Sequence, residues 1–267
     1  MRFTIFGATG FIGSHLVRRL QQAGHDVLAP SRHDMHAAPP VGGHGHVIWA
    51  IGLTGDFHSR PFDTMAANVS ELAPILSQQN FDSFLYLSST RVYAGSGNTA
   101  EASSHLVVTP SNPSDLYNIS KLAGESLCLG LARPDIRVAR LANVTGPREE
   151  ERFTFLGDIC RAARGGQIQL RSARVSEKDY IWIDDAVTLL LRIATDGQQR
   201  IYNVASGRQV RHQAWLEAIS ALSGCQWGVE PGATDASFPP IDISRVAAEF
   251  GFAASDVLPR AAEVLNG

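Results

Sequence analysis

Hydrophobic and polar positions alternate in short blocks over the first 145 residues. Apolar and β-branched runs predict strands at 2–6, 26–29, 47–51, 83–88 and 136–141. Segments with helical periodicity lie between them and predict helices at 11–23, 62–79 and 114–131. Strands that alternate with helices are typical of a parallel sheet covered on both faces. The pattern therefore predicts an α/β fold with a doubly wound parallel sheet.

The pattern is less regular after residue 145. Helices are predicted near 153–164, 185–195, 212–222 and 254–265, separated by short strands and Gly/Pro turns. Asp184 and Asp185 precede one of these helices and are interpreted as an N-cap pair. Residues 33–46, between the second and third strands, have no helical period. This connection is expected to contain little regular secondary structure.

A glycine-rich turn joins the first strand to the first helix. The segment reads Gly7-Ala8-Thr9-Gly10-Phe11-Ile12-Gly13. Gly7 would permit a tight turn, Gly10 would let the backbone approach a pyrophosphate, and Gly13 would allow close packing of helix on strand. Strand, glycine turn and helix together predict a dinucleotide site. The alternative is a glycine-rich turn without a ligand in some other α/β protein.

A tyrosine and a lysine stand four residues apart on the predicted helix 114–131. Tyr117 and Lys121 would project from one face, where the ammonium can act on the phenol. A fixed cation lowers a phenol pKa of about 10 by roughly 1–3 units, which would make Tyr117 a proton shuttle. Ser89 ends the strand 83–88 at the carboxyl edge, where α/β sheets bind ligands. The alternatives are an amphipathic surface pair and hydroxyls that satisfy only backbone groups.

With these motifs, the chain resembles the extended short-chain dehydrogenase/reductase family, which includes nucleotide-sugar epimerases, dehydratases and reductases. The glycines follow the Gly-x-x-Gly-x-x-Gly spacing, and the resemblance covers nearly the whole chain. Its further marks, in order, are Val47–Gly52, Asn68-Val69, Leu87–Tyr93, Arg140–Pro147, Asp179–Val187 and Tyr202–Gly207.

The resemblance implies a fold, a cofactor and a substrate class. Residues 1–145, plus returning segments, would form a Rossmann-type NAD(P)-binding domain, and residues 146–267 would mostly form a small α/β substrate domain. The substrate would be a nucleotide-linked sugar. Tyr117 would be the acid/base, Lys121 would lower its pKa and hold the nicotinamide ribose, and Ser89 would polarise the oxygen. The implied cofactor contacts are Gly7, Thr9, Gly10, Phe11, Ile12, Gly13, Ala50, Ile51, Gly52, Asn68, Tyr117 and Lys121.

The choice between NADP and NAD depends on the end of the second strand. An acid there would hydrogen-bond the ribose of NAD, but this chain has Ser31 and Arg32. A guanidinium suits the 2′-phosphate of NADP, which is therefore the expected cofactor. NAD stays possible because Asp34 could reach the same ribose.

Three further positions concern the substrate. Thr90 and Arg91 stand where family dehydratases carry an Asp-Glu pair, which makes 4,6-dehydration unfavourable. Arg91 either contacts an anionic substrate group or is simply solvated. Asn143 matches a position that contacts substrate phosphate or sugar. Lys178 stands where many relatives have a phosphate-binding arginine, and it keeps the charge without the bidentate fork.

Composition and charge exclude several other classes of protein. A net charge of −3 gives no electrostatic reason to expect nucleic acid, and no apolar run approaches the length of a membrane span. Cys128, Cys160 and Cys225 indicate neither a disulfide framework nor a zinc site. The first strand begins at residue 2, so no signal peptide is expected and the location is predicted to be cytoplasmic. The histidines at 33, 36, 44 and 46 lie in a Gly/Pro loop with few acids, and no metal is expected.

Two enzymatic activities fit the same residues. A keto-sugar reductase with exchangeable NADPH is the main expectation, and a nucleotide-sugar epimerase with retained NAD is the alternative. A non-catalytic cofactor-binding regulatory protein is disfavoured by the presence of Ser89, Tyr117 and Lys121 together. In the resembling family, the helices matching 62–79 and 114–131 pair across a twofold axis, which implies a homodimer. Alternatively, helix 62–79 or the C-terminal segment covers the apolar residues Ile119, Leu122 and Leu129 of helix 114–131 within one chain.

Overall fold

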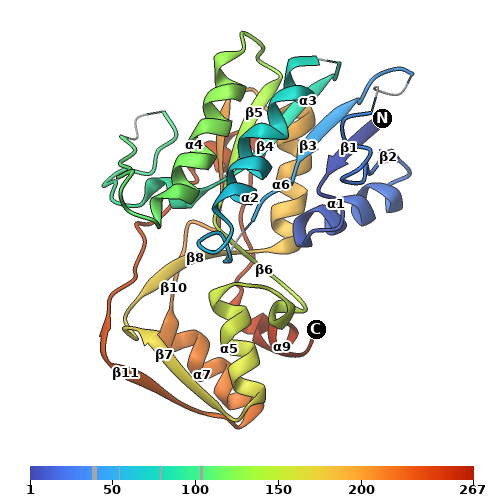
Figure 1. The fold of residues 1–267 in the computed structure, drawn as a ribbon. Coiled ribbons are helices and arrows are strands. Elements are labelled where there is room, and N and C mark those ends of the chain that lie inside the picture. Colours follow the sequence, from blue (N-terminus) through green and yellow to red (C-terminus); the bar gives the residue numbers. More distant parts are fainter. Residues whose placement is uncertain (38–40, 54, 79, 103–104) are drawn as a thin grey trace.

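A six-stranded parallel sheet forms the centre of the larger part of the molecule (Figure 1). The computed structural model describes residues 1–37, 41–53, 55–78, 80–102 and 105–267. The strand order is β2-β1-β3-β4-β5-β9. The strands are β1 (Arg2–Phe6), β2 (Asp26–Leu28), β3 (His46–Trp49), β4 (Ser83–Ser89), β5 (Ile136–Leu141) and β9 (Ile201–Val204). The five strands predicted before residue 145 are confirmed, and the fold class with them.

The order of the strands reverses at β1, which pairs with β2 on one side and β3 on the other. At such a switch point the loops that follow the strands diverge and leave a crevice at their carboxyl ends. The glycine turn after β1 and Ser89 at the end of β4 both belong to this edge. The topology alone therefore brings the predicted cofactor turn and the predicted catalytic serine to one side of the sheet.

Helices cover both faces of the sheet (Figure 1). One face carries α1 (Phe11–Gln22) and α6 (Ile183–Asp196), and the other carries α4 (Asp115–Gly130) with α2 (Pro61–Met65) and α3 (Leu72–Gln78). Alternate residues of β4 fill the two cores. Leu85 and Leu87 belong to the core beneath α1 and α6, and Phe84 and Tyr86 to the core beneath α3 and α4.

The predicted helix 62–79 is wrong in one respect, because it is interrupted. Between α2 and α3 lies a π-helical turn, η1 (Ala66–Ser70), in which Glu71 N donates to Ala66 O at 2.9 Å. Pro74 explains the break, since it has no N–H to donate to Ser70 and its ring would crowd that carbonyl. The π turn places Asn68 in the buried layer between this segment and α4.

The smaller part lies against the carboxyl edge of the large sheet (Figure 1). It has a three-stranded sheet of β10 (Gln209–Arg211), β8 (Glu177–Trp182) and β6 (Asn143–Thr145), and a parallel pair of β7 (Gln167–Ser172) and β11 (Gln226–Thr234). Its α-helices are α5 (Phe155–Arg164), α7 (His212–Ser223) and α9 (Ala261–Asn266). Short 3-10 turns are η2 (Thr90–Tyr93), η3 (Glu149–Glu151) and η4 (Leu258–Arg260).

Two helix predictions in the second half need correction. The helix expected at 254–265 is reduced to η4 and α9, while α8 (Ser244–Phe250), which was not predicted, packs against β9 of the large sheet. Asp184 and Asp185 lie within the first turn of α6, and Trp182 occupies the N-cap. Asp184 accepts a hydrogen bond from Trp182 Nε1 at 3.2 Å. Their charge still suits the positive end of the helix, although they do not cap it.

Among the described residues, none of the helices has both the length and the apolar character needed to span a lipid bilayer.

Candidate active site

The glycine turn after β1 is held in the shape that its sequence predicts. Gly7 has a φ of +85°, and a Cβ there would lie 2.7 Å from the backbone of Ala50. A Cβ at Gly13 would lie 2.1 Å from Gly7 O, so α1 can approach β1 only through a glycine. Gly10 is the N-cap of α1, and no side chain caps the helix. The turn therefore presents an uncapped helix N-terminus, which suits a phosphate.

This helix N-terminus opens into a cleft of about 560 Å³ at the carboxyl edge of the sheet. The cleft brings together most of the predicted site residues from all three classes. The cofactor class contributes Gly10, Phe11, Ile12, Ala50, Ile51 and Gly52, the catalytic class Ser89, Tyr117 and Lys121, and the substrate class Arg91, Asn143 and Lys178. Gly7 and Gly13 lie beneath the lining as part of the turn.

The remaining cofactor residues, Thr9, Ser31, Arg32 and Asn68, are not part of the cleft lining. Thr9 is exposed in the glycine turn. Ser31 and Arg32 are exposed after β2, and Ser31 Oγ donates to Asp34 Oδ2 at 2.5 Å. Their predicted contact with the ribose end of the cofactor stays a prediction.

Tyr117 and Ser89 both line the cleft, where the Ser89 side chain acts on the Tyr117 phenol. Ser89 ends β4, and its Oγ also accepts a hydrogen bond from Arg91 N at 3.2 Å, which fixes its position. The Tyr117 ring packs against Phe57 with a centroid separation of 5.2 Å. Burial raises the pKa of Tyr117, and the hydrogen bond with Ser89 and the charge of Arg91 oppose that rise. The net direction is upward, so the expected lowering by Lys121 is not what the structure shows.

The position and the lowered pKa of Lys121 explain why it does not lower the pKa of Tyr117. Its ammonium donates to Leu87 O at 2.9 Å and lies 5.8 Å from the centre of the Tyr117 ring. Burial lowers the pKa of Lys121 to about 7, and the charge of Glu125 opposes this shift. A lysine with that pKa is only partly charged at neutral pH. Removal of water from both side chains therefore outweighs their mutual attraction.

Asn68 and Gly52 complete the surroundings of Lys121. A Cβ at Gly52 would lie 3.3 Å from Lys121 Nζ and 3.7 Å from Asn68 Oδ1. Asn68 Nδ2 donates to Ser120 Oγ at 2.9 Å, while its Oδ1 is buried without a hydrogen-bond partner among the described residues. Asn68 therefore lies beside the lysine, where its role as a predicted cofactor residue stays a proposal.

The catalytic face of α4 lies close to the sheet because of one small residue. A Cβ at Gly124 would lie 2.4 Å from Tyr86 Oη and 2.7 Å from Asn68 O. Gly124 thus lets the face of α4 that carries Tyr117 and Lys121 approach the sheet. Any larger side chain would force α4 away from β4.

The substrate candidates lie on both sides of the cleft. Arg91 belongs to η2 and packs over the Phe57 ring at 5.2 Å. Its Nε is buried while the residue as a whole is half-buried, so its guanidinium is only partly open to solvent. Asn143 begins β6, and its Nδ2 donates to Asp179 O at 2.8 Å, which joins β6 to β8. Lys178 lies on β8, with Nζ 5.8 Å from the Phe155 ring.

The histidines of the 33–46 segment have separate surroundings. His36 contacts Glu71, His44 packs against Phe6, and His46 Nδ1 lies 2.9 Å from Ser83 Oγ. These contacts give each ring a different structural role.

Sequence reasoning missed a buried polar network behind the catalytic residues. Ser88 Oγ donates to Glu125 Oε1 at 2.5 Å, and Glu125 forms an ion pair of 2.6 Å with Arg140. Arg140 Nη1 then donates to Tyr93 Oη at 2.9 Å, and Tyr93 donates to Asn203 Oδ1 at 2.8 Å. One signal was available in the sequence. Arg140 is a charged residue inside the predicted apolar strand 136–141, and a buried charge requires a buried partner.

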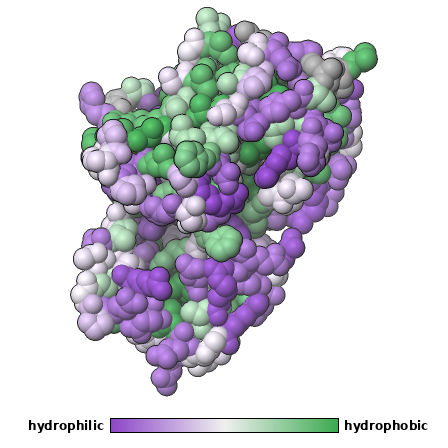
Figure 2. All heavy atoms as spheres, viewed as in Figure 1, coloured by the Kyte–Doolittle hydropathy of each residue, from purple (hydrophilic) through white to green (hydrophobic). Residues whose placement is uncertain are grey.

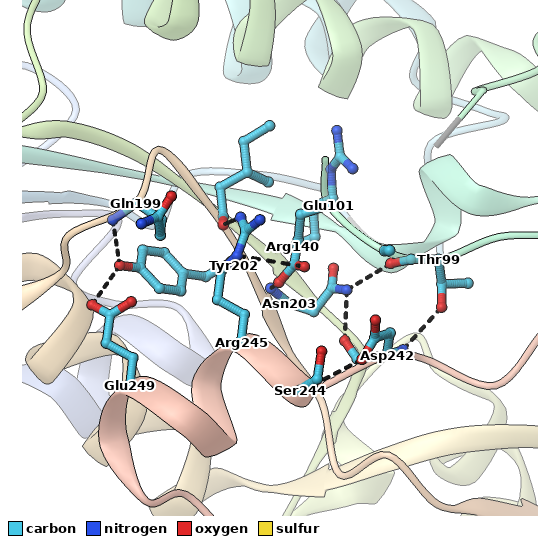
Figure 3. Close-up of polar contacts among 12 residues, drawn as sticks. Thr99, Glu101, Arg140, Gln199, Tyr202, Asn203, Asp242, Ser244, Arg245 and Glu249 are labelled. Atoms are coloured by element: carbon cyan, nitrogen blue, oxygen red, sulfur yellow. Dashed lines mark hydrogen bonds and ion pairs between the residues drawn. The ribbon is translucent and has the colours of Figure 1, made fainter. Parts of the chain in front are cut away.

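The network continues to the wall of the cleft through Asn203 (Figure 3). Asn203 Nδ2 donates to Thr99 O and to Asp242 O, both at 2.8 Å. Thr99 in turn donates to Pro240 O at 2.8 Å. The adjoining residues Phe238, Pro239 and Ile241 line the cleft. Asn203 therefore ties the loop at Thr99 and the segment 238–242 to the edge strand β9.

Beyond Asn203, the same layer is closed by ion pairs and hydrogen bonds (Figure 3). Glu101 accepts a hydrogen bond from Asn203 N at 3.0 Å and lies 3.7 Å from Arg245 Nε. Tyr202 donates to Glu249 at 2.7 Å. These contacts attach α8 to the sheet edge.

Comparison with known proteins adds relatives to this geometry. The chain is 29% identical over 254 residues to GDP-6-deoxy-D-mannose reductase of Pseudomonas aeruginosa, covering 83% of this chain and 80% of that protein. It is 26% identical over 263 residues to GDP-mannose 3,5-epimerase 1 of Oryza sativa subsp. japonica, covering 82% and 68%.

Solved structures share the fold over nearly the whole chain. The structure of RMD from Pseudomonas aeruginosa complexed with NADPH matches with a TM-score of 0.79 and 23% identity, covering 99% of this chain and 98% of that one. MoeE5 in complex with UDP-glucose and NAD matches with a TM-score of 0.80 and 23% identity, covering 99% and 97%.

The model of the NAD dependent epimerase/dehydratase family matches residues 3–50 and 43–205. These segments include the glycine turn, Ser89, Tyr117 and Lys121. The resemblance seen in the motifs is confirmed, and with it the prediction of an NAD(P)-dependent enzyme. The chain belongs to the NAD-dependent epimerase/dehydratase family.

Proposed function

We propose that the protein is an NADPH-dependent reductase of a keto group on a nucleotide-linked sugar. The observation that carries this proposal is the Ser89–Tyr117 pair in the same cleft as the uncapped N-terminus of α1. Because burial raises the pKa of Tyr117, its phenol is protonated near neutral pH. A protonated phenol is the form that gives a proton to a carbonyl oxygen during reduction.

The residues present fit a dinucleotide cofactor. The turn at Gly7 and Gly10 would hold the pyrophosphate, Gly52 leaves room beside Lys121, and Lys121 would bind the nicotinamide ribose. When bound, the cofactor supplies the hydride. Tyr117 donates a proton to the sugar oxygen, and Ser89 donates a hydrogen bond to the same oxygen. Together the two hydroxyls select an oxygen held within hydrogen-bond distance of both.

The division of labour follows the architecture. We assign residues 1–145 and the returning elements α6, β9 and α8 to cofactor binding, and most of residues 146–267 to substrate binding. We also place the enzyme in the cytoplasm, because Cys128, Cys160 and Cys225 are all unpaired thiols.

An epimerase with retained NAD is the second candidate. It is favoured by relatives such as the GDP-mannose 3,5-epimerase of Oryza sativa. The reductase is favoured by the relative from Pseudomonas aeruginosa and by the exposed Arg32 after β2, which suits a 2′-phosphate. The test is to identify the nucleotide that co-purifies with the protein and to titrate NADPH and NADH. An empty protein that binds NADPH more tightly supports the reductase, whereas tightly held NAD supports the epimerase.

We propose a homodimer formed by α4 and the α2–α3 segment. Figure 2 shows hydrophobic side chains gathered over α4 and the neighbouring α2. Phe62 on α2 is 88% exposed, and Leu127 on α4 is 37% exposed. Ile119, Leu122 and Leu129 on α4 are only partly covered within the chain. A twofold interface would bury this surface in both copies. Light scattering at micromolar concentration tests it, since a monomer of 28.8 kDa would contradict the proposal.

A further inference from the structure

The charged groups that line the cleft do not balance one another. Arg152 forms an ion pair of 2.8 Å with Glu149. The carboxylate of Asp179 accepts hydrogen bonds from the backbone N–H groups of Ser206 and Gly207, at 2.8 and 2.7 Å. The buried acids of the lining are therefore already bound to partners within the protein. Any cation that is left over has to find its counter-charge in a ligand.

Arg91 is such a cation. Burial lowers its pKa although the charges of Tyr117 and Asp115 act to raise it, and no ion pair holds it among the described residues. Its Nε is buried without a hydrogen-bond partner among the described residues, and its Nη2 contacts only the carbonyl of Ser114, at 3.4 Å. The guanidinium packs over the Phe57 ring at 5.2 Å, which holds its plane in place. A buried guanidinium nitrogen with nothing to donate to is costly unless a ligand accepts its hydrogen bond.

Lys178 is a second cation in the same cleft. Its ammonium lies between two rings, 5.8 Å from the centres of both Phe155 and Phe238. Burial and the nearby charge of Arg91 both lower the pKa of Lys178. Two like charges close enough for Arg91 to act on Lys178 indicate a site completed by anionic groups.

The two cations occupy different places relative to the chemistry. Arg91 follows Ser89 by two residues, donates its backbone N–H to Ser89 Oγ, and holds its guanidinium 6.0 Å from the Tyr117 ring centre. An anion at Arg91 would therefore lie next to the reacting carbon. Lys178 lies on β8 in the smaller part. A nucleoside diphosphate is attached at the anomeric carbon, away from a carbonyl elsewhere on the ring, and Lys178 is the cation available to it.

We propose that Arg91 binds a carboxylate on the sugar ring, so that the substrate is a nucleotide-linked sugar acid of the hexuronate class. This inference rests on the proposed function and narrows its substrate. The Nε and one terminal nitrogen of Arg91 match the two oxygens of a carboxylate in the bidentate geometry that guanidinium groups favour. Lys178 then serves the diphosphate of the same molecule.

Matched ligand pairs test the proposal without turnover. UDP-glucose is compared with UDP-glucuronic acid, and GDP-mannose with GDP-mannuronic acid, because the members of each pair differ only at C6. Binding is measured by calorimetry on the NADP⁺-loaded wild type and on Arg91→Gln, Arg91→Lys and Lys178→Met. We expect the wild type to bind the uronate of at least one pair about ten- to a hundredfold more tightly than its neutral partner.

The variants distinguish carboxylate binding by Arg91 from general binding of the nucleotide sugar. Arg91→Gln should remove the preference, and Arg91→Lys should restore part of it, because the charge returns without the fork. Lys178→Met should weaken both members of a pair equally. The proposal is overturned if no pair shows a preference in the wild type, or if the preference survives in Arg91→Gln. NADPH binding by fluorescence in the same samples reports on the proposed function separately, so that either idea can fail alone.

Discussion

The ammonium of Lys121 lies 5.8 Å from the ring centre of Tyr117 and is hydrogen-bonded to the carbonyl of Leu87. The lysine is thus anchored to strand β4, although it shares a helix face with the tyrosine. Arg91, not Lys121, is the cation that opposes the rise in the pKa of Tyr117. The spacing of the two residues on the helix therefore does not by itself predict how Lys121 acts on Tyr117.

The lowered pKa of Lys121 has a consequence for stability. Its pKa in the folded protein is about 7, below the ordinary value of 10.5, so the unfolded chain binds the proton more tightly. The stability contributed at this site should therefore rise as the pH increases from 7 towards 10. Lys121→Met removes this dependence, so its stability relative to the wild type should fall by about 2–3 kcal/mol between pH 6 and pH 9. Urea denaturation at both pH values measures the difference, and a constant difference would contradict the lowered pKa.

Tyr117→Phe should remove the transferable proton and leave the fold intact. General acid–base groups contribute about 10²–10⁴-fold in rate, so we expect a loss of this size in kcat with nearly unchanged NADPH affinity. Tyr202→Phe is the matched control, because Tyr202 donates to Glu249 away from the cleft. Steady-state kinetics on a reducible nucleotide sugar compare the two. A Tyr117→Phe enzyme as active as the control would remove Tyr117 from the mechanism.

Arg32→Asp should move cofactor preference from NADP towards NAD. A carboxylate in this position would repel the 2′-phosphate and accept a hydrogen bond from the free ribose hydroxyl. Loss of a charge-assisted bond corresponds to about one to two orders of magnitude in affinity for NADPH. Arg171→Asp, at an exposed position of strand β7, makes the same charge change in the smaller part of the molecule. If both variants bind NADPH with the same affinity, another residue binds the 2′-phosphate.

Much of the site could be predicted because it depends on local patterns. The glycine turn, the Tyr117–Lys121 spacing and Ser89 at a strand end each follow from a few neighbouring residues. Parallel strands bring their carboxyl ends to one edge, and so the cleft joins elements that are far apart in the sequence.

What could not be predicted depends on burial and on distant partners. The pKa of Tyr117 rises because water is excluded, which no spacing rule contains. The ion pair of Glu125 with Arg140 joins a helix to a strand, and α8 forms where apolar periodicity is too short to be recognised. The π turn at 66–70 required attention to Pro74, which breaks the hydrogen-bond pattern of the preceding turn.

Asn203 should position the segment 238–242, which lines the cleft on the proposed substrate side, without contacting the cofactor site. Asn203→Ala removes the donors to Thr99 O and Asp242 O and leaves these carbonyls without them, and it takes the acceptor from the Tyr93 O–H. Each buried group left unpaired costs about 1–3 kcal/mol, so the segment 238–242 should loosen. We expect KM for the nucleotide sugar to rise about tenfold or more, with the affinity for NADPH unchanged. Thr99→Val, which removes the bonds of the Thr99 hydroxyl to Pro240 O and Asp242 N, should shift the same two quantities in the same directions. A fall in kcat with KM unchanged in both variants would show that the hydrogen bonds of Asn203 and Thr99 act on the catalytic residues and not on the segment 238–242.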